Sequence, residues 1–394
     1  MNKYYILTLL FLQFACANAN IIINGNNITK DYVILDIINQ GHLLDYNQKY
    51  EIAKVENDLL ALDIFEDVFI ELQDSLYIIN ITEKPKVITF PLIDRNESLG
   101  WSYGIKLHLN NIKGENKKLK FNVATGAIGS GSISYEQPSF KNNHQLSGEV
   151  FKRNRTDIEE NYLLEESQLN IIYKIPNNTT STLIFNLSYL NNNLKFYNTN
   201  NFINYYGSAL SLEYSNSYLQ KTYKNNFNAK IIFYDFNNFN TYQYLDLVNS
   251  FTYSINDLKN ISLLIRNQLS IYSTINIPIY QQLYIGGEEG VRSYEQNPSL
   301  NDIEIQNQLV TNNAFFTTLQ LQLPFYETSW IKSQLLFFID YGVGADYYKS
   351  FNMNNKISGK GFGLRFNIAE QGDIDMCIGT NKYGKKILHF IVNI

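Results

Sequence analysis

Residues 315–325 read FFTTLQLQLPF, and this stretch indicates the fold class of the chain. Between Thr318 and Leu323, leucines alternate with threonine and glutamine. Successive side chains of a β-strand point to opposite faces, so this period of two predicts a strand with one apolar and one polar face. The same alternation recurs beyond residue 99 in the segments 182–190, 210–214, 261–265, 335–341, 362–368, 374–378 and 388–394.

Strands with one apolar face occur in two settings, a half-buried soluble sheet and a membrane-spanning barrel. A soluble sheet of this size needs helices or a second sheet to cover its apolar faces, and no amphipathic helical pattern follows Leu62. The 30 tyrosines and 25 phenylalanines suit the aromatic girdles of membrane barrels. Residues 99–394, at about 18 residues for each strand with its loop, predict an all-β transmembrane barrel of about 16 antiparallel strands.

Residues 1–19 have the pattern of a secretory signal peptide. Lys3 precedes a short, largely apolar core over residues 4–14, and residues 17–19 form an A-x-A cleavage site. This pattern predicts that the mature chain begins near Asn20.

The two cysteines predict no internal disulfide. Cys16 lies in the predicted signal peptide, so Cys377 is the only cysteine of the mature chain. A lipoprotein attached through Cys16 is a weaker alternative, because Gln13 stands where an aliphatic residue is expected. After the signal no run of about 20 apolar residues predicts a transmembrane helix. The net charge of −5 argues against a nucleic-acid partner.

Residues 20–88 have a different periodicity and predict a small mixed domain. A short strand is followed by two helical patterns, one capped by Thr29 and one opening near Asp45. Two strand patterns then end before Pro85, so the predicted order is β-α-α-β-β. Residues 89–98 are expected to form a linker to the barrel.

Two short segments of this domain, 62–68 (LDIFEDV) and 82–85 (TEKP), resemble motifs of POTRA domains. An unrelated small α+β domain is the alternative. The resemblance implies a periplasmic module that receives extended polypeptide segments by adding a strand to its exposed edge, near Val68, Ile70 and Leu72.

A glycine-rich segment, residues 286–295 (GGEEGVRSYE), carries a single arginine, Arg292. By strand alternation Asp340 faces the barrel lumen, and so does Arg365 on the next predicted strand. A charge buried in a lumen needs a partner, and a guanidinium can bind a carboxylate through two hydrogen bonds. These residues predict an ion pair between Arg292 and Asp340. The alternatives are a loop arginine in an ordinary porin constriction and an aspartate that lines a wet lumen.

These residues stand in motifs that resemble those of the POTRA-barrel superfamily of outer-membrane proteins, which includes BamA, TamA, the TpsB transporters and the bacterial surface antigen family. Segment 286–294 resembles the motif that opens the long sixth extracellular loop of the superfamily, and segment 338–342 (FIDYG) resembles its F-x-D-x-G motif. The resemblance implies that loop 285–314 folds into the lumen, where Arg292 and Asp340 lock it. The supporting motif residues are Gly286, Gly287, Val291, Tyr294, Phe338, Gly342 and Arg365.

The chain departs from the superfamily pattern in three places. Ser293 replaces a glycine of the loop motif, which predicts a less tight local turn. The C-terminus lacks a terminal aromatic residue, and Phe390 is the nearest one. A single POTRA module is expected, whereas TpsB proteins have two with a plug helix and BamA has several.

The resemblance implies insertion of outer-membrane proteins, or translocation of polypeptide, in the outer membrane of a Gram-negative-type bacterium. Expected partners are unfolded outer-membrane or secreted polypeptides, membrane lipids, and accessory periplasmic or lipoprotein subunits. A dedicated two-partner-type transporter for one substrate is one alternative, and a passive channel or surface anchor is another. The strand near Gly100–Leu109 is expected to close the barrel against Leu388–Ile394, at a seam to which a nascent strand can pair.

No pattern in the sequence predicts an enzyme, a cofactor or a metal site. The chain contains neither a G-x-S-x-G elbow nor an H-E-x-x-H motif. Its four histidines are scattered without the spacing of metal ligands.

Overall fold

The computed structural model describes residues 20–40, 48–73, 76–96, 100–141, 144–157, 162–177, 180–197, 202–220, 222–256, 261–287, 290–295, 310–328, 330–346, 350–352, 356–368 and 372–393. The predicted signal peptide lies outside these residues. The chain divides into two compact units, one formed by Met1–Ile88 with His108–Leu119 and one by Thr89–Leu107 with Lys120–Ile394.

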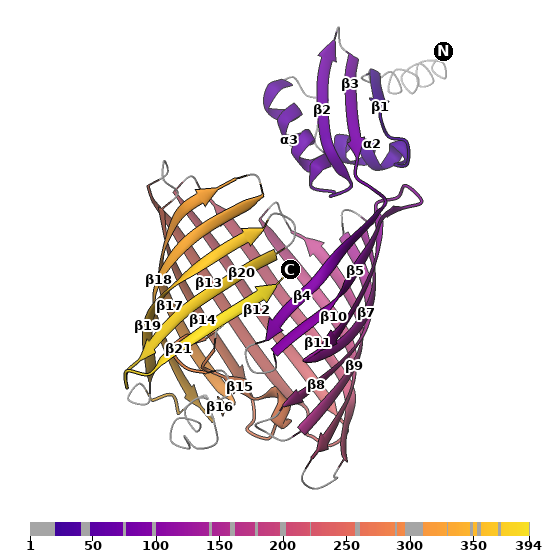
Figure 1. The fold of residues 1–394 in the computed structure, drawn as a ribbon. Coiled ribbons are helices and arrows are strands. Elements are labelled where there is room, and N and C mark those ends of the chain that lie inside the picture. Colours follow the sequence, from indigo (N-terminus) through magenta and orange to yellow (C-terminus); the bar gives the residue numbers. More distant parts are fainter. Residues whose placement is uncertain are drawn as a thin grey trace, which may run out of the picture. The chain divides into compact units, whose positions relative to one another are not determined.

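The N-terminal unit has the predicted element order (Figure 1). Its elements are β1 (Asn20–Asn24), α2 (Asp31–Gln40), α3 (Gln48–Leu60), β2 (Phe65–Gln73) and β3 (Leu76–Glu83). The sheet order is β1-β3-β2, with β1 parallel and β2 antiparallel to β3. Strand β2 is therefore an edge strand.

One hydrophobic core holds this unit together. Helices α2 and α3 contribute apolar residues at helical spacing, and β2 and β3 contribute alternate residues from one face of the sheet. Burial of one such side chain stabilises a fold by about 1.5–3 kcal/mol. The buried members are Val33, Ile34, Ile38, Val55, Leu59, Ile64, Phe65, Val68, Ile70, Tyr77, Ile79 and Ile81.

Thr29 does not cap α2, contrary to the prediction. Its hydroxyl donates to Glu83 Oε1 (2.5 Å) and accepts from Asn111 Nδ2 (2.7 Å), which lies near the end of β5 (Gly100–Ile112). The turn that follows β5 brings Glu115 close to Lys117 and Lys30, whose ammonium groups lower the pKa of its carboxyl to about 2. The first unit thus includes residues 108–119, which sequence periodicity assigned to the barrel.

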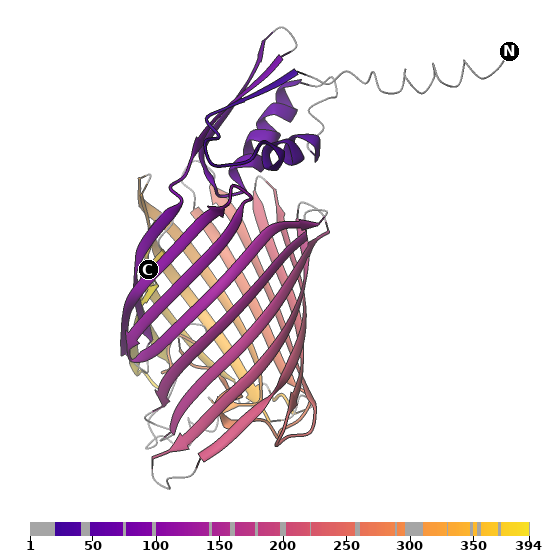
Figure 2. The ribbon, with the colours of Figure 1, turned by 90° about the vertical axis from the view of Figure 1, so that its right-hand side faces the viewer.

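The second unit is a closed barrel of 16 strands, which confirms the predicted fold class (Figures 1 and 2). The strands are inclined to the barrel axis, as closure requires (Figure 2). They are β4 (Val87–Asn96), β5, β6 (Lys117–Gly126), β7 (Ile128–Lys141), β8 (His144–Asp157), β9 (Tyr162–Pro176), β10 (Ser181–Phe196), β11 (Phe202–Leu219), β12 (Tyr223–Phe236), β13 (Tyr242–Asn256), β14 (Ile261–Tyr272), β17 (Asn313–Glu327), β18 (Ile331–Ala345), β19 (Ile357–Ile368), β20 (Gly372–Asn381) and β21 (Lys386–Asn393).

The predicted linker over residues 89–98 is wrong, because β4 occupies most of it. The barrel closes between β21 and β4, so the strand near Gly100–Leu109, which belongs to β5, is the second strand and does not form the seam. The sequence of β4, VITFPLIDRN, concealed the strand. Pro91 cannot donate to a ladder, and Asp94 and Arg95 interrupt the apolar alternation.

The two faces of the barrel strands differ as the alternation predicts. On β17, Leu319 is exposed on the outer surface, whereas its neighbour Gln320 is buried against the lumen. The described residues include no helix that is long and apolar enough to cross a membrane.

The first part of the long connection between β14 and β17 packs against the lumenal face of β9 to β14. It contains the short helix η1 (Ile279–Gln281) and the strands β15 (Leu283–Tyr284) and β16 (Val310–Thr311). Tyr280 Oη accepts from Asn192 Nδ2 (2.9 Å), and Tyr242 Oη donates to Gln281 Oε1 (2.5 Å). Ile277 and aromatic residues of β9 to β14 form one buried cluster around this segment.

Candidate functional site in the barrel lumen

The motif segment of the loop is folded tightly onto itself. The backbone N–H of Val291 donates to the carbonyl of Ile285 (2.8 Å), and that of Gly287 donates to the carbonyl of Tyr294 (2.9 Å). Two glycines are required by close backbone approach. A Cβ atom on Gly286 would lie 2.3 Å from the carbonyl oxygen of Glu295, and one on Gly290 would lie 2.1 Å from that of Ile285.

Arg292 extends from this turn to Asp340 on β18. Its Nε donates to Asp340 Oδ2 and its Nη2 to Oδ1, both at 2.9 Å, and its backbone N–H donates to Oδ2 at 3.1 Å. Arg292 is 7% exposed and Asp340 is 1% exposed. The structure therefore brings together the two residues for which a loop lock was predicted, in the two-bond geometry that distinguishes arginine from lysine.

Two further side chains contact the guanidinium. Nη1 donates to Gln320 Oε1 on β17 (2.7 Å), and the guanidinium carbon lies 3.6 Å from the ring centroid of Phe338 on β18. The ring offers a cation–π contact to a charge that is removed from water. Phe338 was predicted as a motif residue, whereas nothing in the sequence predicted the contact between Arg292 and Gln320.

The barrel wall beneath the loop is lined with glycines. A Cβ atom on Gly342 of β18 would lie 2.4 Å from Ile285 of the loop, and one on Gly379 of β20 would lie 2.2 Å from the carbonyl oxygen of Arg292. A Cβ on Gly359 of β19 would lie 1.5 Å from Ser293 Oγ. The absence of side chains on three adjacent strands thus creates the space that the loop occupies.

Ser293 is fully buried in this space, over Gly359. The sequence predicted a less tight turn at Ser293, but the turn is closed by the Gly287–Tyr294 hydrogen bond and Tyr294 is buried. The hydroxymethyl group of serine is accommodated because the wall lacks a side chain at position 359.

His389 of β21 also binds the loop, although no motif in the sequence pointed to it. Its Nε2 donates to the carbonyl oxygen of Arg292 (2.6 Å), and the residue is fully buried. The available signal was the alternation with Leu388 and Phe390, which places His389 on the lumen face. The loop is thus bound to the last barrel strand as well as to β18.

Arg365 does not join the Arg292–Asp340 pair. Its Nη2 donates to Asp375 Oδ2 (2.6 Å) and its Nε to Asp375 Oδ1 (2.8 Å), and Asp375 is its register partner on β20. Arg365 is therefore lumenal, as the alternation predicts, but it belongs to a second ion pair.

The free edge of β2 in the N-terminal unit is partly occupied. The N–H of Val68 donates to Asp67 Oδ1 (3.0 Å), and the N–H of Ile70 donates to Glu56 Oε1 on α3 (2.8 Å). Alternate N–H groups of an edge strand point away from the sheet, so Leu72 shares this edge. The carboxylate of Glu56 stands where the carbonyl of an added strand would accept.

Within the described residues no group of three or more His, Cys, Asp and Glu side chains could hold a metal ion.

A family model described as the Omp85 superfamily domain matches residues 111–391. BamA from Haemophilus ducreyi, solved without POTRA domains 1–3, is 14% identical, with a TM-score of 0.68 over 94% of this chain and 82% of that one. CdiB from Escherichia coli is 13% identical, with a TM-score of 0.66, and the match covers 95% of this chain and 75% of that one. CdiB from Acinetobacter baumannii is 16% identical, with a TM-score of 0.65, and the match covers 95% of this chain and 73% of that one.

These likenesses are structural and show the shared barrel fold. A comparison with curated protein sequences gives no match. The family model covers most of the chain, including the loop motif, Asp340 and most of the last strand, and it agrees with the resemblance that these motifs indicated. The chain belongs to the Omp85 superfamily.

Proposed function

We propose that this protein inserts polypeptides into the outer membrane through the seam of its barrel, without a cofactor or covalent chemistry. The observation that carries the proposal is the pairing at this seam. Among the residues that the structure describes, strands β21 and β4 share one register pair, Asn393 with Asp94, whereas β20 and β21 share eight. Ordinary membrane barrels leave no open edges, so a seam that is sparsely paired over these residues offers N–H and C=O groups to an incoming strand.

Side-chain contacts supplement the backbone pairing between β21 and β4. Arg95 of β4 donates from Nη1 to the carbonyl of Phe390 on β21, and its guanidinium lies 5.7 Å from the Phe390 ring centroid. Trp101 on β5 packs edge-on against the same ring at 5.9 Å. These side-chain contacts hold the two strands together, and one of them occupies the backbone carbonyl of Phe390. Side-chain contacts can be exchanged one at a time, which suits a site that opens and recloses.

A dedicated transporter for one secreted substrate is the second candidate. It is favoured by the structural likeness to the two CdiB proteins and by the polar lumen-facing residues of the barrel, among them Lys120, Glu136, Arg153 and Glu166. In that case the substrate would pass through the lumen, and the loop held by Arg292 and Asp340 would have to move.

The N-terminal unit is proposed to be a POTRA domain in the periplasm that presents substrate segments to the barrel. Its element order supports this role, and so does the edge strand with Val68, Ile70 and Leu72. Glu56 would then compete with a substrate strand for the N–H of Ile70.

The substitution Glu56→Ala is expected to increase strand addition at β2. A hydrogen bond to a charged group contributes about 1.5–3 kcal/mol, so its removal should raise binding of an extended segment roughly tenfold or more. The measurement is the cross-linking yield between substrate and a photoreactive residue at exposed Gln73. Glu71→Ala, which removes an acid of β2 itself, is the matched control. Equal yields for the two variants would contradict the role of Glu56.

Depletion of the protein, followed by quantification of the outer-membrane and secreted proteomes together, tests the proposed function. Loss of many unrelated barrel proteins is expected for an insertase. Loss of a single secreted or surface protein, with the barrels intact, would support the dedicated transporter instead. If both proteomes stayed unchanged, neither candidate would stand, and a passive channel or surface anchor would be favoured.

A further inference from the structure

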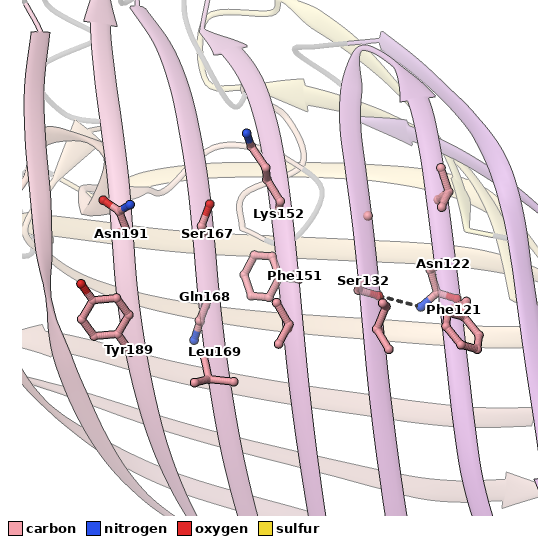
Figure 3. A pocket seen from close by; sticks show the side chains of 14 residues that line it. Phe121, Asn122, Ser132, Phe151, Lys152, Ser167, Gln168, Leu169, Tyr189 and Asn191 are labelled. Atoms are coloured by element: carbon pink, nitrogen blue, oxygen red, sulfur yellow. Dashed lines mark hydrogen bonds between the residues drawn. The ribbon is translucent and has the colours of Figure 1, made fainter.

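The outer surface of the barrel contains a groove over strands β6 to β10, with a volume of about 650 Å³ (Figure 3). Its outward-facing lining includes Val123, Ile133, Val150 and Leu169, which are between 47% and 63% exposed. These apolar side chains belong to the face of the barrel that points away from the lumen.

The groove lies where the outer surface changes from apolar to polar. Register pairing places Ile133, Val150, Leu169 and Tyr189 side by side in one row across β7 to β10. The adjoining row consists of Gly131, Lys152, Ser167 and Asn191. Tyrosine and lysine at such a boundary are typical of the level at which lipid head groups lie.

A missing side chain produces the hollow. At Gly131 a Cβ atom would have only the carbonyl oxygen of Asn122, at 4.0 Å, as a neighbour. No close backbone approach and no positive φ require a glycine there. The position is therefore open to the outside, beside the exposed side chain of Lys152.

Lys152 makes no ion pair with another described residue. The nearby Arg153 and Glu166 are paired with each other on the opposite, lumenal face. Glu165 lies on the outer face, in the next row beyond Ser167, and is not within ion-pair distance of Lys152. An ammonium group thus stands at the polar end of an apolar groove.

We propose that this groove binds one anionic lipid, with an acyl chain along Ile133, Val150 and Leu169 and the phosphate of the head group at Lys152. The proposal rests on the membrane location given under the proposed function. An uncharged amphiphile would fill only the apolar part, whereas a soluble anion would gain only the contact with Lys152. The combination of both contacts selects a phosphorylated lipid.

Native mass spectrometry of the full chain in detergent tests this inference, with phosphatidylglycerol, phosphatidylcholine or diacylglycerol added at equal concentration. The wild-type chain is expected to retain phosphatidylglycerol preferentially. A basic residue near a membrane surface contributes about 1 kcal/mol, so Lys152→Ala should reduce this retention about fivefold. Gly131→Ile, which fills the groove without a backbone clash, should reduce it at least as much.

Two variants on the same outer surface are the matched controls. Lys360→Ala removes an exposed lysine of β19, and Gly129→Ile adds a side chain on β7 outside the groove lining. Both should behave like the wild type. Equal phosphatidylglycerol retention in all four variants, or displacement of the lipid by millimolar inorganic phosphate, would overturn the lipid site.

This measurement does not depend on insertion activity. Fractionation of the protein away from membranes would contradict the proposed location, whereas lipid retention that is insensitive to Lys152 and Gly131 would contradict the groove alone.

Discussion

Arg292→Ala is expected to abolish activity and to destabilise the barrel, although the chain should still insert into the membrane. The substitution leaves the Asp340 carboxylate buried at 1% exposure without its cation, and it removes the donor to Gln320. Loss of one partner of a buried ion pair typically costs 3–5 kcal/mol. The measurements are the unfolding temperature of the barrel on semi-native gels and the protease sensitivity of loop 285–314.

Three variants separate the loop lock from general damage. Arg292→Lys keeps the charge but loses the planar fork, and should recover only part of the stability. The double variant Arg292→Ala/Asp340→Asn removes the uncompensated charge and should be more stable than Arg292→Ala alone. Arg365→Ala breaks the more exposed Arg365–Asp375 pair and should cost less. A protected loop and normal activity in Arg292→Ala would refute the lock.

A disulfide across the seam is expected to stop insertion of substrate barrels. Asp94 and Asn393 are Cα partners, and directly paired residues of antiparallel strands have Cα atoms about 4.5–5.5 Å apart, within disulfide range. The variant is Asp94→Cys/Asn393→Cys in a Cys377→Ser background, because Cys377 is a buried free thiol. Activity should fall under oxidising conditions and return with a reductant, as followed by the folding of a newly added barrel protein.

The matched control joins β20 to β21 through Ile378→Cys/Leu388→Cys, another register pair, and leaves the seam free. This control should remain active when oxidised. If the seam disulfide also left activity intact, substrate would not leave through the seam, and passage through the lumen would be favoured.

The sequence alone predicted the barrel, the approximate number of its strands and the lumenal face of Asp340. These predictions succeed because a β-strand exposes alternate residues to two different environments, and that period is recorded directly in the chain. The same alternation identifies Gln320 and His389 as lumenal, but it does not reveal which lumenal groups meet.

The seam could not be located from periodicity. Strand β4 contains Pro91, Asp94 and Arg95, so its pattern is that of a linker, and its strand conformation comes from pairing with neighbours distant in sequence. Because β4 was predicted to be a linker, β5 was expected to be the first barrel strand and to pair with the last one.

The sequence by itself therefore determined the strands, their inward and outward faces and the charges available for pairing. Only the tertiary structure decided that Arg365 binds Asp375, that Ser293 fits over Gly359 and that β4 closes the barrel. The physical reason is that local periodicity reports the environment of a residue. Partners depend instead on how strands far apart in the chain are brought together, and on which side chains are absent where they meet.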